Sequence, residues 1–274
     1  MAHDSGQAES GLGAVFPAHW TAQRDPVDCV RLPRDSEEFA MAAARCIESV
    51  DSDVHDVYRV QNPALYERFA LRRAQLARDY AHSVGDEEHA QEHGRELERL
   101  VWHGTDTATA EKIVRRGFNR SFSRRAAFGK GVYFAHSAAY SASPTYAKRD
   151  AHGRGVLLLT RMLCSAVVRG SPGMVEAPAP GVCAVDSRSA PNIYVTFEDD
   201  CAYCSHVIIF TDRADRRRTG HTARACHASP CSWQPPPPPP QVPVHKPTWT
   251  IARVPSNLPV WRPPVLQAPA NAHS

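Results

Sequence analysis

Apolar residues recur at helical spacing in two stretches of the first third of the chain. In the first stretch, Asp35 is followed three residues later by Glu38, a pattern typical of a helix start. In the second, Asn62 and Pro63 form a start signal, and arginines line the face opposite the apolar one. The pattern therefore predicts two amphipathic helices. Their apolar positions are Phe39, Ala43, Cys46, Ile47 and Val50 in the first, and Leu65, Phe69, Leu76 and Tyr80 in the second.

The middle of the chain changes from helical to strand-like patterning. The apolar run 100–102 ends in His103-Gly104-Thr105, and residues 107–116 have helical spacing that Gly117 stops, which predicts a strand, a tight turn and a helix. The acidic, histidine-rich residues 85–94 predict a loop. Later β-rich runs, at 132–135, 156–160, 193–197 and 207–210, predict strands of one sheet. Because helices cluster early and strands follow without regular βαβ alternation, the fold class predicted is α+β.

Both ends of the chain differ from the part between them. Residues 1–14 are small and polar, and residues 213–274 combine an arginine run with most of the 23 prolines, six of them consecutive from Pro235 to Pro240. Consecutive prolines favour a polyproline II rod over a packed core. We therefore predict two disordered tails around a domain at 15–212. The proline run is either a passive spacer or a ligand for an SH3-, WW- or profilin-type domain.

Charge limits the partners that the sequence predicts, and the pattern of apolar runs limits the compartment. Thirty-two basic and 29 acidic residues leave a net charge of +3, spread along the chain. Such a balance predicts no direct binding to nucleic acid or membranes. The first residues lack the pattern of a secretory signal, and the aliphatic runs are too short to span a bilayer. The sequence thus favours an intracellular protein, in the cytoplasm, the nucleus or both.

The eight cysteines are mostly far apart, which predicts reduced thiols and no disulfide framework. An alternative is a zinc-dependent binding module. Tetrahedral zinc needs four ligands on an ordered scaffold, and part of the candidate set falls in the proline-rich tail. We therefore expect no metal. The candidate ligands are Cys201, Cys204, Cys226, His227 and Cys231.

Motifs in the central region identify the candidate chemistry. No G-x-G-x-x-G follows a strand, and residues 128–131 do not form a P-loop. What stands out is an ordered series of short motifs. The series is His103-Gly104-Thr105, Gly117-Phe118-Asn119-Arg120, Gly129-Lys130-Gly131-Val132-Tyr133-Phe134-Ala135, Tyr140-Ser141 and Tyr146. It resembles the catalytic domain of the poly(ADP-ribose) polymerase (PARP) superfamily, from about Phe16 to Phe210. The resemblance implies an ADP-ribosyltransferase-like fold, with a split antiparallel or mixed sheet flanked by helices, and NAD⁺ as the ADP-ribose donor.

The resemblance also implies a role for each motif. The Gly104 backbone would pair with the nicotinamide amide because no Cβ blocks a close approach, and the Ser141 hydroxyl would add a bond. Tyr133 and Tyr146 would sandwich the cationic ring. His103 would bind a ribose hydroxyl. The implied NAD⁺-binding set is His103, Gly104, Thr105, Arg120, Tyr133, Tyr140, Ser141 and Tyr146.

The implied catalytic triad is His103, Tyr133 and Ile193, and its third member predicts the product. Chain-elongating members of the superfamily carry glutamate where this sequence has Ile193. Isoleucine has no lone pair with which to activate a second ADP-ribose unit. The resemblance therefore implies transfer of a single unit to protein side chains, the protein itself among the acceptors. The alternative is a catalytically inactive scaffold of the same fold that acts through its proline-rich tail.

Overall fold

A computed structural model describes residues 16–23, 25–89, 94–123 and 127–215. The chain divides into two units, residues 1–238 and 239–274, and the described residues all belong to the first. The second unit, the predicted disordered segment 1–14, the proline run and three of the candidate zinc ligands lie outside the described residues.

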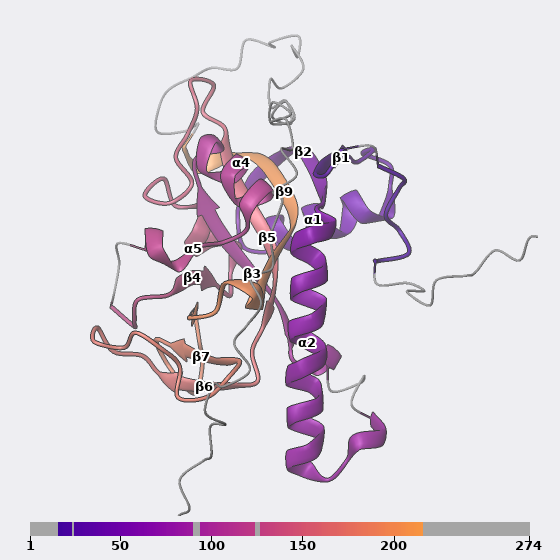
Figure 1. Ribbon diagram of the computed structural model, residues 1–274. Coiled ribbons are helices and arrows are strands. Elements are labelled where there is room, and N and C mark those ends of the chain that lie inside the picture. The colour runs from indigo at the N-terminus through magenta and orange to yellow at the C-terminus, as the bar shows by residue number, and fades with distance from the viewer. Residues whose placement is uncertain (1–15, 24, 90–93, 124–126, 216–274) are drawn as a thin grey trace, which may run out of the picture. The chain divides into compact units, whose positions relative to one another are not determined.

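Nine strands of the described residues form one mixed sheet, in the order β1-β2-β9-β5-β3-β4-β8-β7-β6 (Figure 1). All neighbouring strands are antiparallel except β6 and β7, which are parallel. The α+β class and the mixed sheet are thereby confirmed. The strands are β1 (Asp28–Arg31), β2 (Ser52–Gln61), β3 (Glu98–Thr105), β4 (Val132–Ala135), β5 (Gly155–Leu163), β6 (Ala166–Arg169), β7 (Val182–Val185), β8 (Ile193–Thr196) and β9 (Ala202–Asp212).

The sheet is split between β3 and β4. β3 pairs with β5 along its whole length, from Glu98 to Thr105, whereas it meets β4 at the single pair Trp102–Ala135. β4 then pairs fully with β8. A ladder reduced to one pair leaves the two strands free to diverge on either side of it. The predicted split sheet is therefore present, and the split lies beside the candidate motifs.

Helices cover both faces of the sheet (Figure 1). α1 (Glu37–Ile47) and α5 (Ala138–Ala142) pack with the apolar cluster of Leu157, Leu159 and Phe210, while α2 (Pro63–Val84) and α4 (Thr107–Arg116) pack with the cluster on the other face. Short 3₁₀ segments lie at Glu87–His89, Arg120–Phe122 and Asp199–Cys201. The two predicted amphipathic helices are confirmed as α1 and α2.

Several element boundaries differ from the sequence prediction. His103, Gly104 and Thr105 belong to β3 itself, and the turn comes one residue later, where Asp106 caps α4 by accepting the Thr109 N–H at 2.9 Å. Ser36, rather than Asp35, caps α1. The strands β1, β2, β6 and β7 had no counterpart in the prediction. Ile47 and Tyr80 were predicted on buried faces, and both are exposed.

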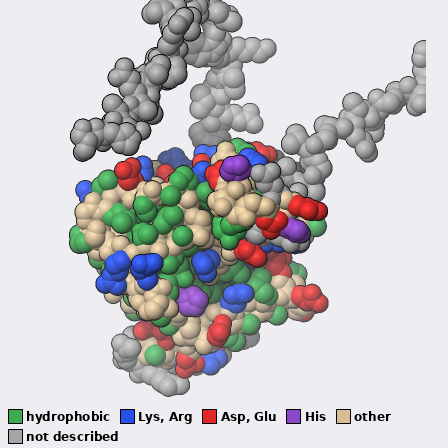
Figure 2. All heavy atoms as spheres, turned by 90° about the horizontal axis from the view of Figure 1, so that it is seen from below, with side chains coloured by type: hydrophobic (Ala, Val, Ile, Leu, Met, Phe, Trp, Pro, Cys, Tyr) green, Lys and Arg blue, Asp and Glu red, His purple; other side chains and the backbone are tan. Residues whose placement is uncertain are grey.

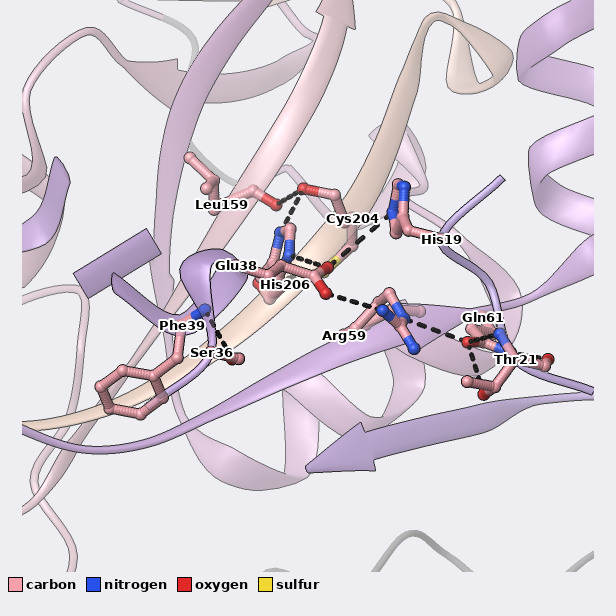
Figure 3. A network of polar contacts seen from close by, with 12 residues as sticks. His19, Thr21, Ser36, Glu38, Phe39, Arg59, Gln61, Leu159, Cys204 and His206 are labelled. Atoms are coloured by element: carbon pink, nitrogen blue, oxygen red, sulfur yellow. Dashed lines mark hydrogen bonds and ion pairs between the residues drawn. The ribbon is translucent and has the colours of Figure 1, made fainter. Parts of the chain in front are cut away.

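A polar network that is buried at Arg59, Gln61 and His206 joins the N-terminal segment to the sheet (Figure 3). Glu38 on α1 binds Arg59 of β2 at 2.6 Å and the Nε2 atom of His206 on β9 at 3.0 Å. Arg59 in turn donates to Gln61, which bonds both the N–H and the carbonyl of Thr21. Every member thus has a partner, as burial of polar groups requires.

The described cysteines are free and buried. Cys201 ends the 3₁₀ segment before β9, and Cys204 lies within β9, where its thiol donates to the His206 carbonyl. Among the described residues no group of three or more potential metal ligands converges, and none of the described helices is long and apolar enough to cross a membrane. On the face shown in Figure 2, basic side chains are interspersed with acidic and hydrophobic ones.

Candidate active site at the split in the sheet

The three residues of the predicted triad lie on three strands around the split. His103 is on β3, Tyr133 is on β4, and Ile193 begins β8, with β3, β4 and β8 consecutive in the sheet. His103 contacts Tyr133 directly, because its Nδ1 atom lies 2.9 Å from the Tyr133 carbonyl oxygen. Ile193 packs in one apolar cluster with the Tyr133 side chain. The fold therefore brings all three into one neighbourhood.

The environment of His103 fixes its tautomer. A carbonyl oxygen only accepts, so Nδ1 must carry the proton that it donates to Tyr133. Burial lowers the pKa of His103 and outweighs the Tyr133 carbonyl, which raises it. The imidazole is thus neutral at pH 7, and its Nε2 lone pair can accept a hydrogen bond. Phe118 and Phe134 hold the ring edge-on and tilted, at centroid distances of 5.4 and 5.8 Å.

Tyr133 fastens the end of the loop that precedes β4. Its hydroxyl donates to the Gly129 carbonyl at 2.8 Å and accepts the Phe128 N–H at 3.0 Å. Burial raises the pKa of Tyr133, against the opposing effect of that N–H, so the phenol stays protonated and keeps its donor. The side chain therefore offers an aromatic surface and also holds residues 128–129 in place through two hydrogen bonds.

Gly104 lies against α5, which carries Ser141. A Cβ at position 104 would overlap the Ser141 carbonyl oxygen and lie 3.0 Å from the Tyr146 Cβ. Glycine is required here by the chain's own packing, and not only by space for a ligand as the sequence had suggested. The Ser141 hydroxyl is buried and donates to the Trp102 carbonyl at 3.1 Å, which leaves its oxygen able to accept.

Tyr140 and Tyr146 form a stacked pair next to this contact. Their ring centroids lie 5.1 Å apart with planes 26° from parallel, and the Tyr146 hydroxyl donates to the Tyr140 hydroxyl at 2.8 Å. Tyr146 thus has an aromatic neighbour stacked on one side. Together, β3, β4, the first residue of β8 and the segment 138–147 bring a neutral histidine, a glycine backbone and three tyrosines into one region.

Thr105 and Arg120 are placed differently from the other predicted residues. Thr105 is buried at the end of β3 opposite Val156. The Arg120 guanidinium donates to the Phe197 carbonyl at 2.7 Å, and the Arg120 backbone N–H donates to the Asp199 carboxylate at 3.0 Å. In this structure Arg120 therefore ties the 3₁₀ segment after α4 to the residues that follow β8.

Two residues that support the site were not predicted. Asp186, in the β7–β8 loop, accepts the N–H groups of Asn192 and Ile193 at 3.0 and 3.1 Å. Burial raises the pKa of Asp186, but these donors outweigh it and the net pKa is low, so a carboxylate holds Ile193 in place. Arg149 binds the segment that carries Tyr146. No motif marks either residue, since each acts through backbone groups of nearby residues, and a bond to a backbone group does not depend on the side chain at that position.

This split mixed sheet flanked by helices is the fold of an ADP-ribosyltransferase-type catalytic domain. The chain belongs to the poly(ADP-ribose) polymerase catalytic domain family, whose pattern it matches over residues 36–201, more than half of its length. The resemblance seen in the sequence is thereby confirmed.

Several similar proteins are named as mono-ADP-ribosyltransferases. The chain is 29% identical over 207 residues to human protein mono-ADP-ribosyltransferase PARP14, covering 71% of this chain and 11% of that protein. It is 30% identical over 193 residues to mouse PARP10, covering 65% of this chain and 19% of that protein. With mouse PARP11 it shares 26% identity over 226 residues, 71% of this chain and 64% of that protein. The chain thus spans a small part of the first two relatives.

Proposed function

We propose that this protein is an NAD⁺-dependent ADP-ribosyltransferase that attaches single ADP-ribose units to protein side chains and releases nicotinamide. The observation that carries the proposal is the grouping of His103, Gly104, Tyr133 and Ser141 at the split in the sheet, in a chain of the PARP catalytic domain family. The mono-transferring names of the PARP14, PARP10 and PARP12 relatives support the single-unit product.

The residues supply positioning more than proton transfer. The neutral His103 accepts a hydrogen bond from a ribose hydroxyl at Nε2. The tyrosines and the Gly104 backbone hold the nicotinamide ring. Each of these interactions contributes about 1–2 kcal/mol. As the bond between nicotinamide and ribose breaks, positive charge develops on the sugar. The acceptor oxygen then bonds the same ribose carbon and nicotinamide leaves with the electron pair of the broken bond.

Ile193 limits the reaction to one unit. Its side chain packs with Val195 and Phe197 and offers no atom that accepts a hydrogen bond. An incoming ADP-ribose hydroxyl is therefore not activated, whereas an acidic acceptor side chain brings its own carboxylate. We include the protein's own side chains among the acceptors.

The proposal also covers the protein's partners and its compartment. The proline run at 235–240 is assigned to an SH3-, WW- or profilin-type reader, on the strength of its sequence alone. An intracellular site of action, in the cytoplasm, the nucleus or both, is supported by the free, buried state of the described cysteines.

The test is incubation of the purified protein with labelled NAD⁺, followed by intact-mass analysis. We expect increments of one ADP-ribose unit per modified site, and loss of labelling in His103→Ala. Tyr194→Phe, which changes a buried tyrosine of β8 outside the site, serves as the control. Labelled ladders would refute single-unit transfer, and NAD⁺ binding without any labelling would favour the scaffold alternative.

A further inference from the structure

Arg149 is the centre of a compact set of contacts between the candidate site and the end of the sheet. Its Nη1 atom donates to the Ala147 carbonyl at 2.7 Å, and its Nη2 atom donates to the Ala142 carbonyl at 3.0 Å. Its Nε and Nη2 atoms both donate to one carboxylate oxygen of Asp215, at 2.9 and 2.7 Å. Asp212 lies 3.8 Å away. The guanidinium is thus bonded on both sides.

The two carbonyls bracket the part of the chain that forms one wall of the candidate site. Ala142 follows Ser141 at the end of α5, and Ala147 follows Tyr146. Holding both ends fixes residues 142–147 as a unit. The acids, by contrast, lie at the end of β9: Asp212 is its last residue, and Asp215 comes three residues later.

The surroundings of the guanidinium are shaped to receive it. The Arg149 side chain is 14% exposed, and its Cζ atom lies over the Phe210 ring at 4.9 Å from the centroid. A Cβ on Gly155, the first residue of β5, would lie 2.5 Å from the Arg149 Nη1 atom. Glycine at that position therefore leaves the space that the guanidinium fills. A planar group of five donors suits two carbonyls and a carboxylate, whereas an ammonium does not.

We propose that Arg149 is a positioning residue for NAD⁺: it holds residues 142–147, which include Tyr146, in place against the end of β9. The carboxylates of Asp212 and Asp215 at that end set how tightly the site binds the nicotinamide ring. The inference rests on the proposed function. It goes beyond that function because the hydrogen-bond partners of Arg149 are two carbonyls and a carboxylate of the protein itself, and because Arg149 lies in none of the motifs that define the family resemblance. It also means that residues 212–215, after the last core positions of β9, affect the geometry of the site.

The test compares Arg149→Lys and Asp215→Asn with the wild type in single-unit labelling. We expect KM for NAD⁺ to rise about five- to tenfold in Arg149→Lys and less in Asp215→Asn, with kcat nearly unchanged, because a ring contact made in both ground and transition states is weakened. The inhibition constant of free nicotinamide rises in parallel. Arg213→Ala is the matched control, since Arg213 pairs with Asp51 and Asp53 at the same end of β9 but away from the site.

A second measurement needs no turnover. Hydrogen exchange of the free protein should be faster over residues 138–147 in Arg149→Lys than in the wild type, and unchanged there in Arg213→Ala. Unchanged exchange over 138–147, or an unchanged KM beside normal wild-type labelling, would overturn the role of Arg149 and leave the proposed function standing. A wild type that neither binds nor transfers from NAD⁺ would overturn the function, and this inference with it.

Discussion

At the scale of single residues, the site depends on backbone atoms as much as on side chains. His103 is held by the Tyr133 carbonyl, and Ser141 by the Trp102 carbonyl. Both anchors are main-chain groups of neighbouring strands, so they persist whatever side chains stand there. The hydrogen-bond acceptors that remain are a lone pair on His103 Nε2 and the Ser141 hydroxyl oxygen, each oriented by the sheet.

Gly104→Ala should weaken NAD⁺ binding severely. The new methyl group would meet the Ser141 backbone and the Tyr146 Cβ, and backbone atoms cannot give way as the tip of a flexible side chain can. We expect calorimetry to show at least a roughly 100-fold weaker NAD⁺ affinity, and overpacking to lower stability by roughly 1–3 kcal/mol. Gly173→Ala is the control, because a Cβ there meets nothing within 4 Å. Equal affinities in the two variants would contradict the packing at Gly104.

At the scale of elements, the Tyr133 hydroxyl bonds two consecutive residues of the loop before β4. Tyr133→Phe keeps the aromatic surface but leaves the Phe128 N–H and the Gly129 carbonyl without their partner. Lost hydrogen bonds of this kind cost about 1–2 kcal/mol in total. We expect a lower Tm and a KM for NAD⁺ raised several-fold.

Tyr194→Phe on β8 provides the comparison for Tyr133→Phe in thermal unfolding and labelling kinetics. Tyr194 is also buried, and its ring lies beneath the Arg99 guanidinium. Its hydroxyl has no part in the loop before β4. Equal values of Tm and of KM for NAD⁺ in the two variants would show that the Tyr133 hydroxyl does not hold residues 128–129 in place.

The elements also show what the sequence could and could not predict. Helices with clear caps were found closely, as at Asn62 and at Gly117. β2 was missed because Asp56, Arg59 and Gln61 interrupt its apolar pattern, and these residues are buried through ion pairs and hydrogen bonds that no local pattern reveals. Strand length was underestimated for the same reason in β9, where His206 stands among apolar residues.

The site was predictable as a set of motifs but not as a geometry. Family resemblance identified His103, Tyr133 and Tyr146, whereas it could not show that Gly104 is packed against Ser141 or that Arg120 is engaged by Phe197. Those contacts join residues some 37 to 77 positions apart, and they arise only when the strands assemble. Sequence patterns report local periodicity, so long-range contacts of this kind lie beyond them.

At the scale of the whole molecule, the network around Glu38 makes stability depend on pH. Burial raises the pKa of Glu38, but the His206 hydrogen bond and the Arg59 charge outweigh it, so the pKa lies below its usual value of 4.5. A lowered carboxyl pKa contributes stability that is present above 4.5 and lost as the pH falls through the folded value.

Glu38→Gln should therefore lower Tm at pH 7, and its difference from the wild type should shrink below pH 4.5. Circular dichroism melts across the pH range measure this. Glu37→Gln is the matched control, because Glu37 occupies the same first turn of α1 and is exposed. A Tm difference for Glu38→Gln that stays constant in acid would contradict the network.

The two ends of the chain should contribute unequally to stability. Trp20 packs on Tyr66 and Tyr203 at centroid distances of 5.2 and 6.4 Å, so Trp20→Ala should cost roughly 2–4 kcal/mol. Removal of residues 220–274 keeps Asp215 and should leave Tm unchanged, because a proline-rich segment builds no packed core. Urea unfolding of both variants tests this, and a large loss of stability on truncation would show that the tail packs on the domain.

The single pair Trp102–Ala135 between β3 and β4 has a mechanical consequence. A ladder of many hydrogen bonds would set the spacing of the two strands rigidly, whereas one pair acts as a pivot. The half-sheet that includes β3 and His103 and the half-sheet that includes β4 and Tyr133 can then rotate slightly about that pair, while each keeps its own hydrogen bonds. The site should thus admit flat rings bulkier than nicotinamide when the two half-sheets move slightly apart, with little loss of stability in the rest of the fold.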